Sequence, residues 1–274
     1  MVITVQDFTG IYDYQPFMQE LREIAANSAD IHWLDCTKIV GTDCYCDDDA
    51  IQEINALIDN TQCDSSNKTE SSSIPEIHFF DNGNYHYMSK LWTDRIQEPF
   101  SLIVFDHHPD MQPPRFGGIL SCGGWVKEVL DHNKFIQNVV IIGVKDELIE
   151  TVREELSQSG ETAFLDKVIY IKESELSTFS SPLIAHSSEP IYLSIDKDAL
   201  SSAFAVTNWD QGSLTTELLK AIIAELATKH KILGIDICGE RSQDFEGDEI
   251  HSVQEADSLN NALNYELVEF LQNL

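Results

Sequence analysis

Basic residues are scarce in this chain of 274 residues. It carries 17 Lys and Arg against 47 Asp and Glu, which gives a formal charge of −30. A protein of that charge repels phosphate backbones and anionic lipid surfaces. Nucleic acid and membranes are therefore not expected as partners, and most carboxylates outside motifs are expected to be solvated surface groups.

Long apolar runs and a cysteine framework are also absent. No segment approaches the roughly 18 apolar residues that span a bilayer, and the opening residues MVITVQDFTGIYDY contain no basic leader. The six cysteines show no pairing pattern, which indicates reduced thiols in a chain of this size. Cys44 and Cys46 form one isolated C-x-C, a weak signal for zinc. These absences predict a cytoplasmic protein.

Hydrophobic residues make up 42% of the chain, which is enough for a large core, and we expect one domain over residues 1–274. Short β-rich runs alternate with segments of helical periodicity. The expected strands are 2–5, 31–35, 76–80, 101–106, 138–144, 167–171, 190–196 and 231–237. The expected helices are 17–24, 51–58, 125–130, 148–156, 214–226 and the C-terminal segment 259–274.

Several of these strands are continuous Val/Ile/Leu runs, which is typical of parallel strands covered on both faces. The alternation predicts an α/β fold with a three-layer, mainly parallel sheet and right-handed crossovers. The Ser/Asn/Thr-rich segment 61–73 shows no periodicity and is expected to be a loop within the domain.

Polar clusters follow three of the apolar runs: DHHPD after SLIVF, SIDKD after PIYL, and DICGE after KILGI. The carboxyl ends of parallel strands open onto one crevice, so the three clusters are expected to face each other. An extended backbone would place Asp106, His108 and Asp110 on one face, because side chains alternate with a period of two. The same period would place Asp196 and Asp198 together.

Five such groups in one crevice would repel each other and lose hydration unless a cation were present. Carboxylate and imidazole ligands without thiolate suit manganese, zinc or iron, and more than four ligands favour two ions about 3.5–4 Å apart. Each motif alone has a simpler interpretation, since D-x-D is common on solvated loops and His-His is often a core pair. Their combination is what indicates metal.

The words D-x-H-x-D and S-x-D-x-D at the ends of two strands resemble the arginase, agmatinase and formimidoylglutamase family of ureohydrolases, over residues 75 to 240. That family has a doubly wound, eight-stranded parallel sheet, shared in outline with the histone deacetylases, and eight strands are also expected here. The Gly-rich stretch DNGNYHYMSKLW supplies His86 where the family has its first metal histidine. The resemblance implies two Mn²⁺ ions per chain, with Zn²⁺ or Fe²⁺ as alternatives. It assigns His86, Asp106, Asp110 and Asp198 to one ion and Asp106, His108, Asp196 and Asp198 to the other.

The resemblance also implies an activity, in which a hydroxide bridging the ions attacks a guanidino or amidine-type carbon and releases urea from a guanidino group. Asp110 would orient the hydroxide and carry its proton to the leaving nitrogen. Glu240 resembles the family glutamate that pairs with the substrate guanidinium, one residue later than usual; the alternative is a surface Glu beside Arg241. The expected partner is thus a small guanidino or amide substrate, and the family suggests a homo-oligomer.

The chain departs from the arginase pattern at three positions expected to line the substrate pocket. Gln112 stands where arginases have asparagine, Cys122 where they have a histidine near the leaving amine, and Trp209 in the place of a Gly-rich loop. Cys122 also fits a small core thiol. For an acid that binds the substrate amine, Asp146 and Glu147 are the candidates, with an exposed helix N-terminus as the alternative.

Two further functions stay open. The missing asparagine and histidine suit a catalytically quiet metal protein that holds a guanidino ligand. The His107–His108 pair resembles the acid/base pair of single-zinc deacetylases, an amidohydrolase branch with the same fold. The second aspartate of S-x-D-x-D favours two metals over one.

Overall fold

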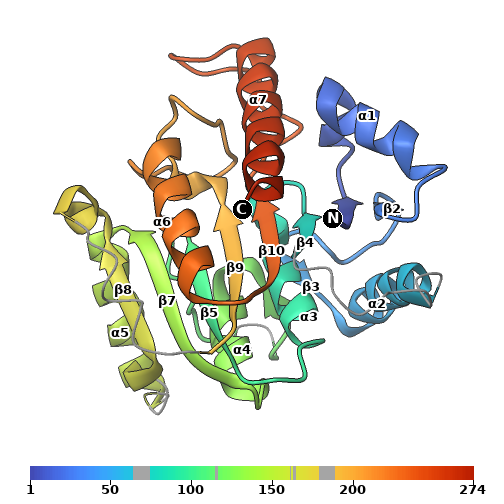
Figure 1. The fold of residues 1–274 in the computed structure, drawn as a ribbon. Helices are drawn as coiled ribbons and strands as arrows, with labels where there is room; N and C mark the ends of the chain where they lie inside the picture. Colours follow the sequence, from blue (N-terminus) through green and yellow to red (C-terminus); the bar gives the residue numbers. More distant parts are fainter. Residues whose placement is uncertain (64–74, 115–116, 161, 163–164, 179–188) are drawn as a thin grey trace.

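The computed structural model describes residues 1–63, 75–114, 117–160, 162, 165–178 and 189–274. All eight predicted strands form, and they pair in parallel within one sheet (Figure 1). Their order across the sheet is β2 (Ile31–Asp35), β1 (Ile3–Asp7), β4 (Glu76–Phe79), β10 (Ile232–Cys238), β9 (Ile191–Asp196), β5 (Phe100–Phe105), β7 (Ile136–Val144) and β8 (Val168–Lys172). The helices are α1 (Pro16–Ala25), α2 (Asp48–Cys63), α3 (Met88–Thr93), α4 (Trp125–His132), α5 (Asp146–Ser159), α6 (Thr216–Lys229) and α7 (Val253–Gln272).

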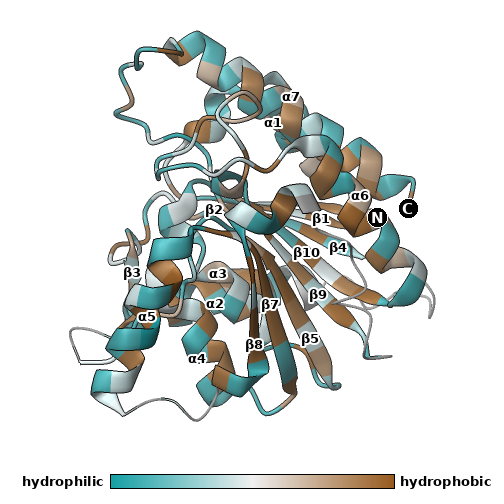
Figure 2. Cartoon of the chain, turned by 90° about the vertical axis from the view of Figure 1, so that its left-hand side faces the viewer, coloured by the Kyte–Doolittle hydropathy of each residue, from teal (hydrophilic) through white to brown (hydrophobic). Residues whose placement is uncertain are grey.

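Helices cover both faces of the sheet, as Figure 2 shows. Apolar residues of α2, α3, α4 and α5 form a core with one face, and those of α1, α6 and α7 form a second core with the other. Strand β5 shows why a continuous apolar run suits this position. Leu102 and Val104 belong to the first core, whereas Ile103 and Phe105 belong to the second. Each such buried side chain contributes roughly 1.5–3 kcal/mol.

Several elements differ from the sequence prediction. Helix α7 begins at Val253 rather than at residue 259, because Ser252 and Glu255 form a capping box that starts the helix earlier. Residues 61–63 of the predicted loop 61–73 lie in α2, and the rest of that loop is outside the described residues. Helix α3 and a small antiparallel pair, β3 (Tyr45–Cys46) with β6 (Leu120–Ser121), were not predicted. Within the described part of the chain, no helix has the length and apolar content needed to cross a bilayer.

Three neighbouring strands in the middle of the sheet position the polar clusters. In β5 and β9, Phe105 is opposite Ile195, and in β9 and β10, Asp196 is opposite Cys238. The residues that follow these strands therefore emerge side by side at the carboxyl edge of the sheet.

Candidate metal centre

The D-x-H-x-D residues are brought together by a turn, and not by an extended strand as predicted. Strand β5 ends at Phe105, and the side chain of Asp106 then accepts a hydrogen bond of 2.6 Å from the backbone N–H of His108. Asp110 has a left-handed backbone with φ of 45°, which aspartate tolerates better than most residues. This turn allows all three side chains to point inward.

A second turn does the same after β9. Asp196 caps the short 3-10 turn Lys197–Ala199, and its Oδ1 accepts a hydrogen bond of 3.0 Å from the N–H of Asp198. Both aspartates are buried. Lys197 lies on the opposite side, where its Nζ contacts Glu240.

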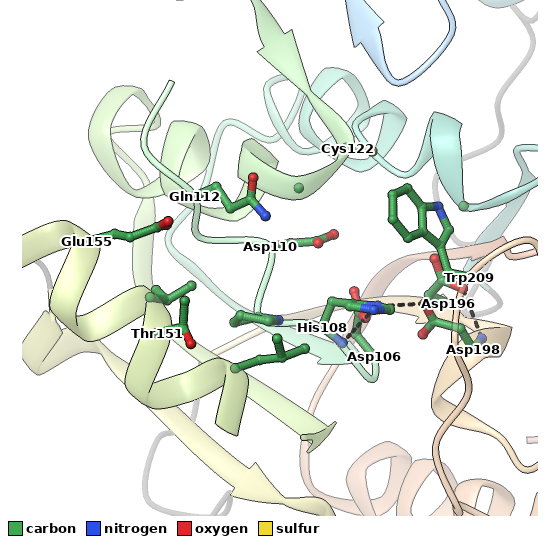
Figure 3. A pocket seen from close by; sticks show the side chains of 15 residues that line it. Asp106, His108, Asp110, Gln112, Cys122, Thr151, Glu155, Asp196, Asp198 and Trp209 are labelled. Carbon is green, nitrogen blue, oxygen red and sulfur yellow. Dashed lines mark hydrogen bonds and ion pairs between the residues drawn. The ribbon is translucent and has the colours of Figure 1, made fainter. Parts of the chain in front are cut away.

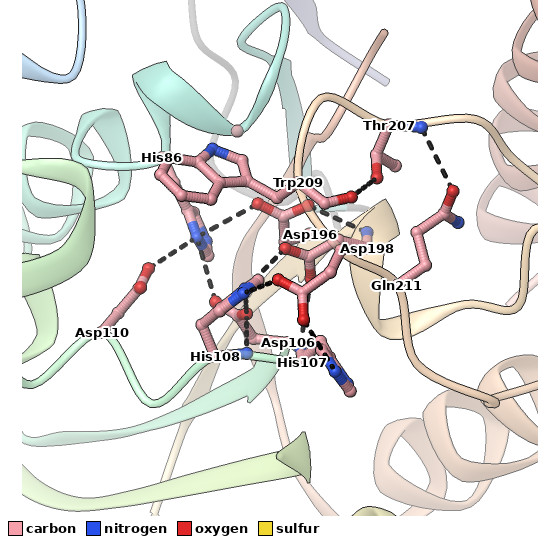
Figure 4. Close-up of polar contacts among 12 residues, drawn as sticks. His86, Asp106, His107, His108, Asp110, Asp196, Asp198, Thr207, Trp209 and Gln211 are labelled. Atoms are coloured by element: carbon pink, nitrogen blue, oxygen red, sulfur yellow. Dashed lines mark hydrogen bonds and ion pairs between the residues drawn. The ribbon is translucent and has the colours of Figure 1, made fainter. Parts of the chain in front are cut away.

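His86 forms the centre of a first group of ligands. It follows the 3-10 turn Gly83–Tyr85 at the start of α3. Its Nδ1 lies 3.2 Å from Asp106 Oδ2, 3.0 Å from Asp110 Oδ2 and 3.5 Å from Asp196 Oδ2 (Figure 4). His86, Asp106 and Asp110 are close enough to hold one ion.

His108 forms the centre of a second group. Its Nδ1 lies 2.9 Å from Asp198 Oδ2 and 3.5 Å from Asp106 Oδ1, and these three residues could hold another ion. Asp106 belongs to both groups. The resemblance assigned Asp198 to the His86 ion as well, but the structure places Asp196 beside His86 and Asp198 beside His108.

The protonation of the centre reflects crowding of carboxylates in a buried space. Burial, together with the charge of Asp198, raises the pKa of Asp196 to about 7, and burial with the charge of Asp106 raises the pKa of Asp198 to about 6. Burial alone lowers the pKa of His86 and His108, but the adjacent carboxylates outweigh it and raise both pKa values.

The outer nitrogen of each histidine is held by a residue that was not assigned this contact from the sequence. Ser194, the serine of S-x-D-x-D, lies 2.8 Å from His86 Nε2, and Asp210 lies 2.9 Å from His108 Nε2. Such partners fix the ring and leave Nδ1 for a metal. Asp210 lies in the segment that replaces the family's Gly-rich loop. That replacement was the one feature of the sequence that could have indicated the contact between Asp210 and His108.

The buried atoms fit a metal ion. His86 Nδ1 and Asp106 Oδ2 are both buried without a hydrogen-bond partner, although they lie 3.2 Å apart. Unpaired buried polar atoms of this kind are costly unless a cation joins them. The oxygen-rich donor set suits manganese, zinc or iron. Cys238 Sγ also lies beside His86 and Asp196, but burial raises the pKa of its thiol, which donates to Asp196.

A cavity of about 120 Å³ opens beside the two groups (Figure 3). It is lined by Gly83, Asp106, His108, Pro109, Asp110, Gln112, Cys122, Gly123, Leu148, Thr151, Val152, Glu155, Asp196, Asp198 and Trp209. Figure 3 shows Asp106, Asp196, Asp198 and Trp209 at one end and Thr151 and Glu155 of α5 at the other. Five of these described lining residues are carboxylic acids and none is Lys or Arg.

Three of the four residues predicted to contact substrate lie in this wall, namely Gln112, Cys122 and Trp209. Trp209 is 43% exposed and packs edge to face against His108. The candidate acids at the start of α5 do not line the cavity, because Asp146 accepts a hydrogen bond from Ser174. Instead, α5 contributes Leu148, Thr151, Val152 and Glu155 to the wall. The apolar periodicity of a helix does not indicate which of its residues line a pocket.

Glu240, the fourth residue, is not in the wall. It is buried, and its Oε1 lies 2.5 Å from the fully buried Nζ of Lys197. Gln15 and Asn264 donate hydrogen bonds of 2.8 Å to its two oxygens. Residue 239, which precedes Glu240, is a glycine with φ of +94°, and a Cβ at residue 239 would lie 2.4 Å from Asp196 Oδ1. Residue 239 therefore cannot carry a side chain that reaches the cavity in place of Glu240.

Replacing Glu240 with glutamine is expected to lower the free energy of unfolding by about 3 kcal/mol, because Lys197 is left as a buried charge without its counter-ion. Denaturant unfolding at pH 7 measures this loss. The control is Glu98→Gln, which removes a surface ion pair with Lys231 and should cost less than about 1 kcal/mol. Unchanged stability of Glu240→Gln with a raised KM would instead support the substrate contact that the resemblance implied.

His107 lies outside the cavity wall. Its ring is 4.0 Å from Glu173 and 3.7 Å from Asp210, on the other side of the turn from His86. A neighbouring pair of catalytic histidines is therefore not present at this site among the described residues, which argues against the deacetylase interpretation.

Comparisons with known proteins identify the family of this chain and solved structures of similar fold. The model of the arginase family matches residues 84–243. An uncharacterized protein of Thermotoga maritima is 27% identical over 238 residues, which cover 87% of this chain and 79% of the relative.

Solved structures show the same fold. Agmatine ureohydrolase of Thermoplasma volcanium superposes with a TM-score of 0.62 at 13% identity, covering 99% of this chain and 89% of that one. Proclavaminate amidino hydrolase from Streptomyces clavuligerus superposes with a TM-score of 0.63 at 18% identity, covering 98% of this chain and 90% of that one. A triple mutant of a T. brucei arginase-like protein bound with Mn²⁺ superposes with a TM-score of 0.59 at 17% identity, covering 97% of this chain and 89% of that one. With its eight-stranded parallel sheet and a family match over more than half of its length, this chain belongs to the arginase family.

Proposed function

We propose that this arginase-family chain is a hydrolase that uses two metal ions to break a C–N bond in a guanidino compound. The observation that carries the proposal is that two ligand groups, His86 with Asp110 and His108 with Asp198, share Asp106 beside an open cavity. A carboxylate that both groups share would hold two ions close together, and two-metal hydrolytic sites have ions about 3.5–4 Å apart.

Manganese is the proposed metal. Oxygen-dominated ligand sets suit Mn²⁺, and the fold neighbour from T. brucei is described as bound with Mn²⁺. Zinc and iron also accept these donors. When bound, two such ions would lower the pKa of water between them and so supply a nucleophile at neutral pH.

Asp110 is the proposed proton carrier. Its Oδ2 accepts a hydrogen bond of 2.7 Å from Trp125 Nε1, and its side chain points into the cavity (Figure 3). His108 is the one histidine in the described part of the cavity wall, and carboxylates already engage both of its ring nitrogens, Asp198 at Nδ1 and Asp210 at Nε2. A hydrogen bond with Cys44 and burial raise the pKa of Cys122, which keeps its thiol protonated. Proton transfer to the leaving nitrogen is thus assigned to Asp110.

The wall also restricts the far end of the substrate. Glu155 lies across the cavity from the metal groups, and no Lys or Arg lines the described wall (Figure 3). A negatively charged tail would be repelled there, whereas an amine would be attracted. We therefore propose a substrate with a guanidino group at one end and a neutral or cationic group at the other.

Manganese-loaded protein is expected to release urea from a guanidino amine such as agmatine faster than from 4-guanidinobutyrate, which ends in a carboxylate. Glu155→Gln should lower kcat/KM for the amine about 10-fold, the equivalent of roughly 1.4 kcal/mol, with little effect on a neutral guanidino compound. Glu154→Gln, one residue away and outside the wall, is the matched control.

The same set of guanidino compounds also tests the alternative of a catalytically quiet binding protein. The absence of a second histidine from the described part of the cavity wall favours that alternative. Thermal stabilisation by a guanidino compound without urea from any member of the panel, with two ions bound, would replace the hydrolase proposal with that alternative. We also propose the cytoplasm as the compartment, supported by the five cysteines whose side chains the structure describes, all of which are free thiols.

A further inference from the structure

Cys44 and Cys122 are directly opposite each other at the end of the small β3–β6 pair. The register pairs Tyr45 with Ser121 and Cys46 with Leu120, and the next step in that register pairs the two cysteines. The N–H of Cys122 donates a hydrogen bond of 2.9 Å to the carbonyl of Cys44, whose left-handed backbone, with φ of 58°, lies just before the strand. In a regular antiparallel ladder, opposite residues have Cα atoms about 4.5–5.5 Å apart. That separation lies within the range that a disulfide spans.

The two thiols already contact each other. A hydrogen bond from the Cys122 thiol lowers the pKa of Cys44, while the same contact, followed by burial, raises the pKa of Cys122. Both side chains are partly exposed, whereas Cys36, Cys46 and Cys238 are buried. Burial raises the pKa of each of those three thiols. Among the described cysteines, Cys44 therefore has the accessible sulfur best able to act as a nucleophile.

We propose that Cys44 and Cys122 form a redox-active dithiol that a low-molecular-weight disulfide, such as oxidised glutathione, converts to a cross-strand disulfide in the cavity wall. The Cys44 sulfur attacks one glutathione sulfur, breaks that S–S bond and releases one reduced glutathione. The Cys122 sulfur then attacks the Cys44 sulfur and releases the second. Two thiols lose two hydrogens, and one oxidised glutathione gains them as two reduced molecules.

The site is separate from the ligand groups but adjacent to the cavity. Cys122 lines the cavity beside Gln112, whose N–H donates to the carbonyl of Gly123. Oxidation would tie this wall covalently to Cys44 without touching His86 or the metal-binding aspartates. The inference does not rest on the proposed hydrolase function, because the dithiol is defined by its own geometry.

The test is incubation of the folded chain in buffers of increasing oxidised-to-reduced glutathione ratio, followed by acid quenching, alkylation and peptide mass mapping. The expected product is a peptide pair joined through Cys44 and Cys122, with two hydrogens lost and two fewer thiols available to alkylation. Excess reduced glutathione should restore both thiols. Cys122→Ser should stop at one glutathione on Cys44, because the resolving thiol is missing.

Cys46→Ala is the matched control, since Cys46 is the neighbouring strand residue and is buried. It should form the same cross-link as the unaltered chain. Failure of the unaltered chain to form any Cys44–Cys122 link at the most oxidising ratio, or a link through another cysteine instead, would overturn the proposal. Mapping of the unaltered chain is decisive even where a variant does not fold.

Discussion

Asparagine in place of Asp106 is expected to lower turnover of a guanidino substrate by about 10³-fold or more and to remove at least one of the two metal ions. Asp106 is 1% exposed, and its two oxygens lie toward different histidines, Oδ2 toward His86 and Oδ1 toward His108. Asparagine preserves the shape but removes the charge and one of the two oxygen donors. Both ligand groups should therefore weaken together.

Metal content by elemental analysis after dialysis, measured beside steady-state urea release, checks this expectation. Asp59→Asn is the matched control, because Asp59 is an exposed aspartate paired with Arg95 on the surface. It should keep both ions and full turnover. Two retained ions in Asp106→Asn would show that the shared carboxylate does not hold the centre together.

Removal of metal is expected to destabilise the chain strongly at pH 8 and much less at pH 5. At a metal concentration about 1,000 times each dissociation constant, two ions stabilise the folded chain by roughly 8 kcal/mol. Metal binding requires the ligands without their protons, so this stabilisation weakens as pH falls.

The metal-free chain should show the opposite dependence on pH. The pKa values of Asp196 and Asp198 are raised to about 7 and about 6 in the folded chain, mainly by burial, from an ordinary value of 3.8. A group with a raised folded pKa contributes stability that is complete below its unfolded pKa and is lost as pH rises through the folded pKa. Stability of the chelated chain should therefore fall from about pH 4 to pH 7. His86 and His108 act in the same direction above about pH 6.5.

Melting temperatures of chelated and manganese-loaded protein, measured from pH 5 to pH 8, check both trends. The two curves should diverge as pH rises. The double variant Asp196→Asn/Asp198→Asn removes the two titrating carboxyl groups and should make the pH dependence of the chelated protein shallower below about pH 6.5. Parallel curves for the chelated and loaded protein would contradict a centre in which metal replaces protons.

The sequence was a good guide to the strands because a parallel strand buried on both faces leaves a continuous apolar run. Strand β2 has the bounds predicted for it, 31–35, and the other strands differ from their predicted bounds by one or two residues at one or both ends. The order of strands across the sheet has no such local signal. The two-residue strands β3 and β6 are too short for any periodicity, so the contact between Cys44 and Cys122 could not be predicted.

The clustering of the candidate metal ligands could be predicted because motifs at the ends of strands determine where side chains emerge. Their grouping could not, since the turns at Asp110 and Asp196 depend on backbone conformation. Glu240 shows a different limit. Glu240 lies one residue later than the family glutamate, directly after Gly239, and its carboxylate contacts Lys197. The sequence gives no sign of this contact, because it depends on how the buried lysine packs.

The pairing of β5 with β9 has a consequence for how the protein is made. Asp106 and Asp198 lie 92 positions apart and become neighbours only after β9 has joined the sheet. A ribosome must therefore release most of the polypeptide before both ligand groups exist. An incomplete chain that ends before β9 can offer only His86, Asp106, His108 and Asp110. The proposed pair of ions could therefore bind only after this strand has been synthesised.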